Sequence, residues 1–387
     1  MSKKPARSVA ISTGGGDAPG LNAVIRAVVK SAANVYGWRV YGIRDGFDGL
    51  LGGEPLIELT PATVRGILPR GGTILGAANR GNPFARRTRV DGKEVIVDDS
   101  HRVLERLVAL GIEGMILVGG DGTMHIAHDL IRLGARIVGV PKTIDNDLGG
   151  TDVTFGFDTA LHTATDAIDK LHTTAESHHR VMVCEVMGRH AGWLALNAGL
   201  AGGADVILIP EIPFDIERVC AKIDQRNKRG AYFSIVVVAE GAYPAGGRPL
   251  YREHGVAGVA SRLGGIGRWA ADAIAECRPV EVRSIALGHL QRGGSPSPFD
   301  RILATRLGAA AMRLVAEGRW GRMSAVRGTE ITDVSIAEAI AAPKLVDPEG
   351  ELVRTACDLG VEFGAAVPAD RPEESKERLK ERSRARS

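Results

Sequence analysis

The 387-residue chain has little of several residue types on which other classes of protein depend. Its four cysteines are widely separated and form no CxxC pair, so neither a zinc cluster nor a disulfide framework is predicted (Cys184, Cys220, Cys277 and Cys357). No apolar run approaches the roughly 18 residues that cross a bilayer, and the start of the chain has no secretory apolar core. We therefore expect a cytoplasmic protein without a membrane span.

Net charge is also small, at +3 from 49 basic and 46 acidic residues. The segment 371–387 alone holds seven Lys or Arg and four Asp or Glu, so the rest of the chain is close to neutral. A nucleic-acid-binding surface is therefore not predicted. Segment 371–387 has one large apolar residue, Leu379, and is expected to be a disordered charged tail or a frayed helix.

Aromatic residues make up only 4% of the chain, whereas glycine occurs 50 times. This combination suits tight turns between strands and closely packed helices. Short β-branched runs recur, each followed by a glycine-rich or polar turn and then a helical pattern, as over 21–33 and 159–171. The pattern predicts an α/β fold of doubly wound, mostly parallel sheets. The predicted strands are 8–12, 39–43, 114–118, 136–140, 181–186, 206–209, 234–239 and 283–287.

A glycine loop, Thr13–Asn22, joins the first predicted strand to the first helix. Glycines there let backbone N–H groups approach a phosphate, and the helix N-terminus adds positive potential. No Lys-Ser/Thr pair follows Gly20, so the loop is not a Walker A motif, and Pro19 breaks the dinucleotide fingerprint. The alternative is a tight turn that binds nothing.

Two further loops follow apolar strands and carry carboxylates. In the sequence Gly119-Gly120-Asp121-Gly122-Thr123, the acid stands where parallel sheets bind ligands and is suited to hold Mg²⁺. In 141–147, two aspartates lie beside a threonine and a lysine, and an aspartate can accept a hydroxyl proton during phosphoryl transfer. The alternatives are a plain glycine turn and an Asx-rich turn.

Arginines also lie at the starts or just after the ends of predicted strands, where the guanidinium group can bind phosphate through two parallel hydrogen bonds. They lie at Arg180, in Met187-Gly188-Arg189, at Arg283 and in 288–294, where His289 accompanies Arg292. Any one of them alone is more often a surface residue. The pair His125 and His128 lacks an evident third ligand and is interpreted as structural or surface-exposed.

The five motifs GGGDAPGLNAVIR, GGDGT, TIDND, MGR and GHLQRGG, in this order, resemble the 6-phosphofructokinase family from about residue 9 to about residue 312. The resemblance implies two similar α/β domains with the active site in the cleft between them, usually in a homotetramer. It implies transfer of the γ-phosphoryl group of ATP, with Mg²⁺, to the 1-hydroxyl of fructose 6-phosphate in glycolysis. The implied donor domain is 1–156 with 291–341, and the implied sugar-phosphate domain is 157–290 with 342–370.

The matched motifs imply a role for each candidate residue. Asp145 would be the base, Thr143 would assist it and Arg189 would lie against the transferring phosphoryl group. The other residues implied to bind the sugar phosphate are Asp147, Arg180, Met187, Gly188, Glu240, Arg283, His289 and Arg292, of which Arg180 and Arg283 would come from a neighbouring subunit. The residues implied to bind the donor are Gly15, Arg80, Gly120, Asp121, Gly122, Thr123 and Lys142, with Asp121 as the metal ligand.

The sequence departs from the family pattern in two places. The arginine of a GGTxLGxxR motif arrives one residue late, at Arg80. Pyrophosphate-using relatives usually have Asp at the position of Gly122 and Lys at that of Lys142, whereas common bacterial ATP users have Gly at both. A carboxylate at position 122 would repel the α-phosphate of a nucleotide, and glycine leaves room for it.

ATP is therefore the favoured donor, and a pyrophosphate-dependent fructose 6-phosphate 1-phosphotransferase is the alternative. A remote alternative is a non-catalytic sugar-phosphate-sensing subunit, which would be expected to lack the aspartates. Arg26 and Lys30 on the first predicted helix support no prediction of an effector site.

Overall fold

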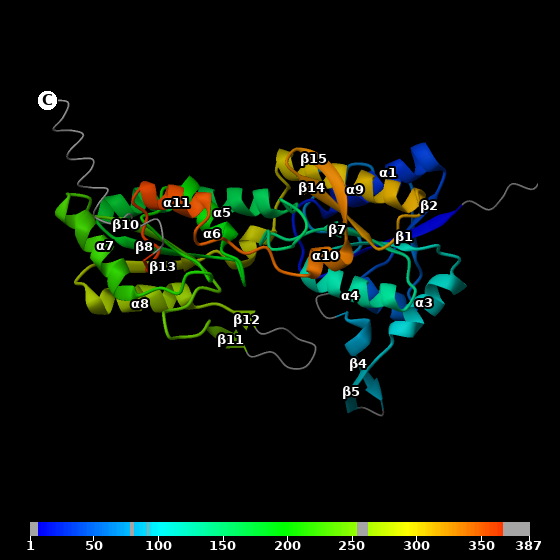
Figure 1. Ribbon diagram of the computed structural model, residues 1–387, viewed down its shortest axis with the longest axis horizontal. Coiled ribbons are helices and arrows are strands. Elements are labelled where there is room, and N and C mark those ends of the chain that lie inside the picture. The colour runs from blue at the N-terminus through cyan, green and yellow to red at the C-terminus, as the bar shows by residue number, and fades with distance from the viewer. Residues whose placement is uncertain (1–6, 78–80, 91–92, 254–261, 367–387) are drawn as a thin grey trace, which may run out of the picture. The chain divides into compact units, whose positions relative to one another are not determined.

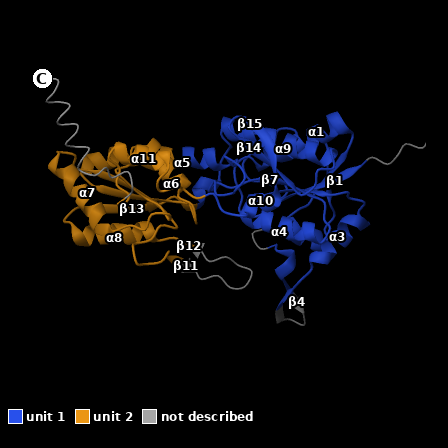
Figure 2. Cartoon of the chain, viewed as in Figure 1, with its two compact units in different colours: residues 1–163, 253–262, 289–344 blue, residues 164–252, 263–288, 345–387 orange. Residues whose placement is uncertain are grey.

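A computed structural model describes residues 7–77, 81–90, 93–253 and 262–366 (Figure 1). The chain divides into two compact units, formed by 1–163, 253–262 and 289–344, and by 164–252, 263–288 and 345–387 (Figure 2). The predicted donor-binding and sugar-binding roles of the two parts stay predictions. The predicted tail, 371–387, and Arg80 lie outside the described residues.

The described strands of the first unit form a seven-stranded sheet in the order β15-β14-β7-β6-β1-β2-β3. The five strands from β14 to β2 pair in parallel, and β3 and β15 close the two edges in antiparallel register. The bounds are β1 Ser8–Thr13, β2 Arg39–Gly42, β3 Ile57–Leu59, β6 Met115–Gly119, β7 Ile137–Pro141, β14 Arg322–Arg327 and β15 Glu330–Ser335.

Helices cover both faces of this sheet because successive strand residues point to opposite sides. Val9 and Ile11 of β1 pack in one core with α1 and α9, whereas Ala10 packs in the other with residues of α2, α3, α4 and α10 (Figure 1). The bounds are α1 Leu21–Ser31, α2 Gly46–Gly52, α3 Ser100–Ala109, α4 Asp121–Arg132, α9 Pro298–Ala316 and α10 Ile336–Ile340. Smaller elements are η1 Ala32–Tyr36, η2 Pro83–Ala85 and the hairpin β4 Arg86–Val90 with β5 Lys93–Val97.

The described strands of the second unit form a four-stranded parallel sheet in the order β13-β8-β10-β9. The bounds are β8 Val181–Val186, β9 Val206–Leu208, β10 Ser234–Ala239 and β13 Val282–Ala286. Its helices are α6 Trp193–Ala201, α7 Ile216–Lys228, α8 Ile266–Cys277 and α11 Glu351–Asp358. Helix α5 (Phe157–His178) begins in the first unit and ends in the second. The short elements β11 Tyr251–Glu253, β12 Arg262–Leu263 and η3 Gly288–Arg292 complete the described chain.

The predicted fold class is confirmed: the structure is α/β with mostly parallel, doubly wound sheets. Each predicted strand corresponds to an observed one with ends that differ by only a few residues, whereas β3, β14 and β15 of the seven-stranded sheet have no predicted counterpart. Within the described residues, no helix is both long enough and apolar enough to cross a membrane.

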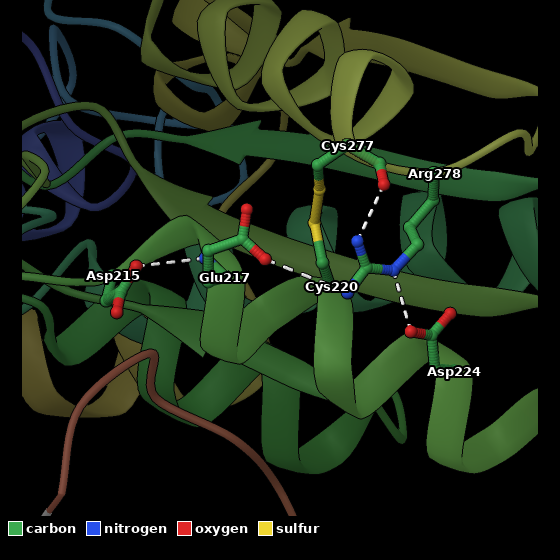
Figure 3. Close-up of a disulfide and its surroundings, with 6 residues drawn as sticks. All are labelled: Asp215, Glu217, Cys220, Asp224, Cys277 and Arg278. Atoms are coloured by element: carbon green, nitrogen blue, oxygen red, sulfur yellow. Dashed lines mark hydrogen bonds and ion pairs between the residues drawn. A yellow bond between two sulfur atoms is a disulfide. The ribbon is translucent and has the colours of Figure 1, made fainter.

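The prediction of no disulfide is wrong for one cysteine pair, since Cys220 and Cys277 are joined (Figure 3). Helices α7 and α8 share one hydrophobic core, which brings together cysteines 57 residues apart in the sequence. Next to the disulfide, Arg278 Nε donates to Asp224 Oδ2 at 2.7 Å, which also ties the end of α8 to α7. Sequence spacing could not reveal this pair because the contact depends on helix packing.

Candidate active site

Three loops of the first unit meet at the carboxyl edge of its sheet. They follow the neighbouring strands β1, β6 and β7, whose last residues are aligned, with Thr13 opposite Val118 and Gly119 opposite Pro141. The Gly14 N–H donates to the Val118 carbonyl at 2.9 Å, and the N–H of Lys142 donates to that of Gly119 at 2.9 Å. The glycine loop, the Asp121 loop and the Asp145 loop are therefore neighbours, as parallel sheets place their ligand sites.

Buried Thr123 packs against the glycine turns of two loops. A Cβ on Gly14 would lie 2.9 Å from Thr123 Oγ1, and one on Gly119 would overlap the threonine side chain. Gly15 adopts a φ of +72°, which favours glycine. The glycines are thus needed where the turns approach Thr123 and where the backbone turns left-handed.

Lys142 is only 4% exposed, and its Nζ donates to the carbonyl of Gly16. Burial, followed by repulsion from the Arg292 guanidinium, lowers the pKa of Lys142 to about 8, although Asp145, Asp17 and Asp147 act in the opposite direction. A low-dielectric environment disfavours the charged form of a lysine unless an anion is close. The ammonium group is therefore held where a bound anion would stabilise it.

Arg292 brings a second cation to the same place. A Cβ on Gly16 would lie 2.7 Å from Arg292 Cζ and overlap Nη1, so the guanidinium lies directly against the glycine loop. Its Nε is buried and has no hydrogen-bond partner among the described residues. Two cations and an unsatisfied donor beside a glycine loop form an environment suited to phosphate.

The Asp145 loop is held by its own backbone and side chains. The Asp145 N–H donates to Thr143 Oγ1 at 3.0 Å, and Thr154 Oγ1 donates to the Thr143 carbonyl at 2.7 Å. Asn146 has a φ of +53°, and its Oδ1 accepts the Thr154 N–H at 3.1 Å. Asp145 and Asp147, on either side of Asn146, are both half-buried, and Asp145 Oδ1 is itself buried.

Asp121 begins α4, and its side chain is 51% exposed. His125, one turn later, places Nδ1 3.3 Å from Asp121 Oδ1. Among the described residues, no three His, Cys, Asp or Glu side chains form a metal-binding group. One exposed carboxylate still fits Mg²⁺, which binds few protein ligands and completes its shell with water and substrate phosphates.

The second unit carries another set of candidate residues at the carboxyl edge of its sheet. Met187, Gly188 and Arg189 follow β8, and Glu240 follows the neighbouring strand β10. The Glu240 N–H donates to the Val186 carbonyl at 2.9 Å, which continues the strand pairing into both loops. The Nε of Arg189 is buried without a hydrogen-bond partner among the described residues. This edge therefore also offers an arginine donor.

Arg180 and Arg283 lie at the opposite, amino edge of the same sheet. Arg180 precedes β8, and Arg283 is the second residue of β13. Both guanidinium groups pair with Glu281 Oε1, at 2.9 Å and 2.5 Å. A six-residue strand spans about 20 Å at roughly 3.3 Å per residue. One copy of the second unit therefore does not bring these two arginines together with Met187–Arg189.

One predicted residue and two residues that the sequence did not point to remain to be placed. His289 is exposed in η3. Sequence reasoning missed Lys344, whose Nζ donates to Asn146 Oδ1 at 2.9 Å, and Glu211, whose carboxylate accepts the Gly192 N–H at 2.9 Å and 3.1 Å. Neither residue belongs to a motif, and Lys344 is 198 residues from its partner, so no sequence signal pointed to them.

Comparison with known proteins gives consistent matches. The family model described as Phosphofructokinase matches residues 8–315. The ATP-dependent 6-phosphofructokinase of Chloroflexus aurantiacus is 56% identical over 365 residues, which are 94% of this chain and 99% of the relative. The pyrophosphate–fructose 6-phosphate 1-phosphotransferase of Streptomyces coelicolor is 53% identical over 342 residues, 88% of this chain and 96% of the relative.

A solved structure extends the match to the fold. The phosphofructokinase of Pichia pastoris in the T-state superposes with a TM-score of 0.77 at 31% identity and matches 92% of this chain. This chain spans 37% of the length of the Pichia chain.

Proposed function

The chain belongs to the phosphofructokinase family, and from this premise we propose that it is an ATP-dependent 6-phosphofructokinase. It transfers the γ-phosphoryl group of ATP to the 1-hydroxyl of fructose 6-phosphate and yields fructose 1,6-bisphosphate and ADP, a reaction of glycolysis in the cytoplasm. The observation that carries the proposal is the alignment of three loops at one sheet edge, which groups Lys142, Asp121 and Asp145.

Phosphoryl transfer depends on positioning and on stabilisation of charge more than on covalent chemistry. The N–H groups of the glycine loop and the Lys142 ammonium bind the donor phosphates. Asp121 would hold Mg²⁺, and the bound ion would neutralise charge on the donor phosphates. Gly120 and Thr123 belong to the turns of the donor-binding loops. Arg189, whose Nε has no hydrogen-bond partner among the described residues, donates to the transferring phosphoryl group.

Asp145 accepts the proton of the sugar 1-hydroxyl while the oxygen of that hydroxyl attacks the γ-phosphorus of ATP. The N–H of Asp145 is fixed by Thr143 Oγ1, so the carboxylate is presented from a rigid turn. Asp147 orients the same sugar. Met187, Gly188 and Glu240 contact the sugar, and His289 and Arg292 bind its 6-phosphate. For Arg292 this role comes from the family resemblance, although its guanidinium lies beside Gly16 of the donor loop.

Gly122 favours ATP over pyrophosphate as the phosphoryl donor. The names of the relatives do not distinguish the two donors. Relatives named for ATP and for pyrophosphate are 56% and 53% identical, so overall identity barely separates them. Apart from its two chain neighbours and the backbone of its own helix, no described atom lies within 4 Å of the place where a Cβ on Gly122 would stand. The space beside the donor loops is open, and a carboxylate placed there would repel the α-phosphate of a nucleotide.

A coupled assay tests the donor. Fructose 6-phosphate is supplied with ATP or with pyrophosphate, each with and without Mg²⁺, and we expect turnover with ATP and Mg²⁺ only. The variant Gly122→Asp should lose ATP turnover, while Gly122→Asn, which has the same size without the charge, should retain more of it. Turnover with pyrophosphate and none with ATP would establish the pyrophosphate-dependent enzyme instead.

Arg180 and Arg283 require a second copy of the chain to take part in the reaction, and we propose a homotetramer. Edge strand β13 supports this, because the residues from Arg283 to Ala286 are all exposed. Mixing the inactive variants Arg283→Ala and Asp145→Asn, followed by subunit exchange, should restore about a quarter of the wild-type activity, because hybrid pairs contain one intact site. No recovery after proven exchange would contradict a shared site.

A further inference from the structure

Lys344 lies at the end of the first unit and contacts the loop of the proposed base. It follows α10, and its backbone N–H donates to the Asp147 carbonyl at 2.8 Å. Its Nζ donates to Asn146 Oδ1 at 2.9 Å and to the Asp152 carbonyl at 2.6 Å. One lysine thus binds two consecutive residues of the loop, directly after Asp145.

Asn146 needs such support because its backbone is left-handed, with a φ of +53°. This conformation is unfavourable for most residues other than glycine, although asparagine adopts it more readily than most, and it is held where the surroundings determine it. The Asn146 side chain is 7% exposed, and its Oδ1 is shared by Lys344 Nζ and the Thr154 N–H. The conformation of the residue after Asp145 is therefore set by contacts that include the Lys344 ammonium.

The charges around Lys344 favour this arrangement. Burial is the main reason that its pKa falls to about 8, and Arg327 acts in the same direction, while Asp152 and Asp147 favour the charged form. The charges of these two aspartates, and the two oxygens that accept hydrogen bonds from the ammonium group, compensate part of its desolvation.

The chain that leaves Lys344 is anchored within two residues. Val346 is 3% exposed, and its N–H donates to Glu211 Oε1 at 2.9 Å. The same carboxylate accepts the N–H of Gly192, three residues after Arg189. The backbone just beyond Lys344 is thus held by a hydrogen bond of its own.

We propose that Lys344 is a positioning residue for phosphoryl transfer, which holds the Asp145 carboxylate in its reactive orientation through Asn146 and the Asp147 carbonyl. The inference rests on the proposed function. A displacement of a reacting group by about 1 Å can lower a rate about 100-fold without abolishing binding. Loss of Lys344 is therefore expected to lower kcat more than it raises either KM.

The test compares Lys344→Met with Lys222→Met in the full-length protein. Lys222, on α7 of the second unit, also donates its Nζ to a backbone carbonyl, that of Gly360, and burial lowers its pKa as well. We expect Lys344→Met to lower kcat by about tenfold or more, with each KM within about threefold of wild type. Lys222→Met should keep the wild-type kcat.

A double-mutant cycle separates positioning from general stability. In an Asn146→Ala background, Lys344→Met should lower kcat by no more than about twofold. The reason is that Asn146 Oδ1, the side-chain oxygen that accepts the hydrogen bond of Lys344 Nζ, is already absent. An equal loss in both backgrounds, or an unchanged kcat in Lys344→Met, would overturn the inference. If Lys344→Met does not fold, Lys344→Gln replaces it in the same cycle under the same criteria.

The activity of the wild-type protein separates failure of the proposed function from failure of the proposed role of Lys344. An inactive wild-type protein refutes the proposed function and the inference with it. An active wild-type protein whose Lys344 variants keep full kcat refutes the inference alone.

Discussion

Replacing Lys142 by methionine should separate what the protein needs for stability from what it needs for catalysis. Lys142 is 4% exposed, and its Nζ donates a hydrogen bond to the carbonyl of Gly16. Its neighbour Arg292 has the same charge. Methionine has similar length and no charge, so it removes the cation while it keeps most of the packing.

The size of the effect follows from the pKa of Lys142, which falls from 10.5 to about 8 on folding. Since one pKa unit corresponds to about 1.4 kcal/mol, keeping this lysine protonated costs the folded state about 3 kcal/mol at pH 7. Between pH 8 and 10.5 the unfolded chain binds more protons than the folded one, so stability rises with pH in this window. At pH 10 the remaining cost is below about 1 kcal/mol.

The assay is urea unfolding of wild type and Lys142→Met at pH 7, 8, 9 and 10. We expect the free energy of unfolding of the wild type to rise relative to that of the variant by about 2–3 kcal/mol between pH 7 and 10. Lys344, whose pKa also lies at about 8, is present in both proteins, so its titration cancels. The exposed Lys228→Met serves as the control and should parallel the wild type.

Activity is measured on the same samples. Lys142→Met should lower kcat/KM for the phosphoryl donor by about 100-fold or more, because it removes a buried charge that binds phosphate. Parallel stability curves for wild type and variant would refute the reasoning, since they would mean that folding does not change the protonation of Lys142. A variant with wild-type kcat/KM would remove Lys142 from the donor site.

Three other changes have defined expected outcomes. Asp145→Asn should lower kcat by orders of magnitude and leave KM for the substrates roughly unchanged, since it removes only the proton acceptor; unchanged turnover in steady-state assays would exclude Asp145 as the base. Gly16→Ala should displace the Arg292 guanidinium and raise KM for fructose 6-phosphate about tenfold. The free energy of unfolding, measured by chemical denaturation, should fall by less than about 1 kcal/mol, because the group that must move is the end of a flexible side chain. Replacing Cys220 and Cys277 by serine should lower the free energy of unfolding by about 2–4 kcal/mol, and thiol titration of the unreduced, unfolded wild type should find two free thiols instead of four.

The residues of the first unit's site could be predicted because they follow short-range rules. Asp121 and Asp145 lie in the loops that follow the buried strands β6 and β7, and parallel strands end at a common edge. Once the alternation of strands and helices is recognised, the loops after β1, β6 and β7 are expected on one side of the sheet. Only the order of the strands, β7-β6-β1, had to come from the structure to make these loops neighbours.

The residues that were missed act over long distances in the sequence. Lys344 reaches Asn146 across 198 residues, and Cys220 meets Cys277 because α7 and α8 lie in one core. Neither contact leaves a periodic pattern or a motif, since each depends on how distant elements pack. Strands β14 and β15 were missed for a related reason: β14 joins the sheet through β7, which is far away in the sequence, and β15 joins it through β14.

Lys142 and Lys344 show why such a site is hard to explain by stability alone. Lys142 is held beside Arg292, which lowers its pKa further, and Lys344 fixes a left-handed asparagine next to Asp145. In the free protein the first arrangement is unfavourable, because two cations are close together in a site of low dielectric. An anion that binds between them would reverse the sign of this interaction. Features that destabilise the unliganded fold and stabilise a complex are expected at functional sites. The strained loop and the cation pair meet at the same sheet edge, and this coincidence is a physical argument, independent of any family resemblance, that phosphate chemistry takes place there.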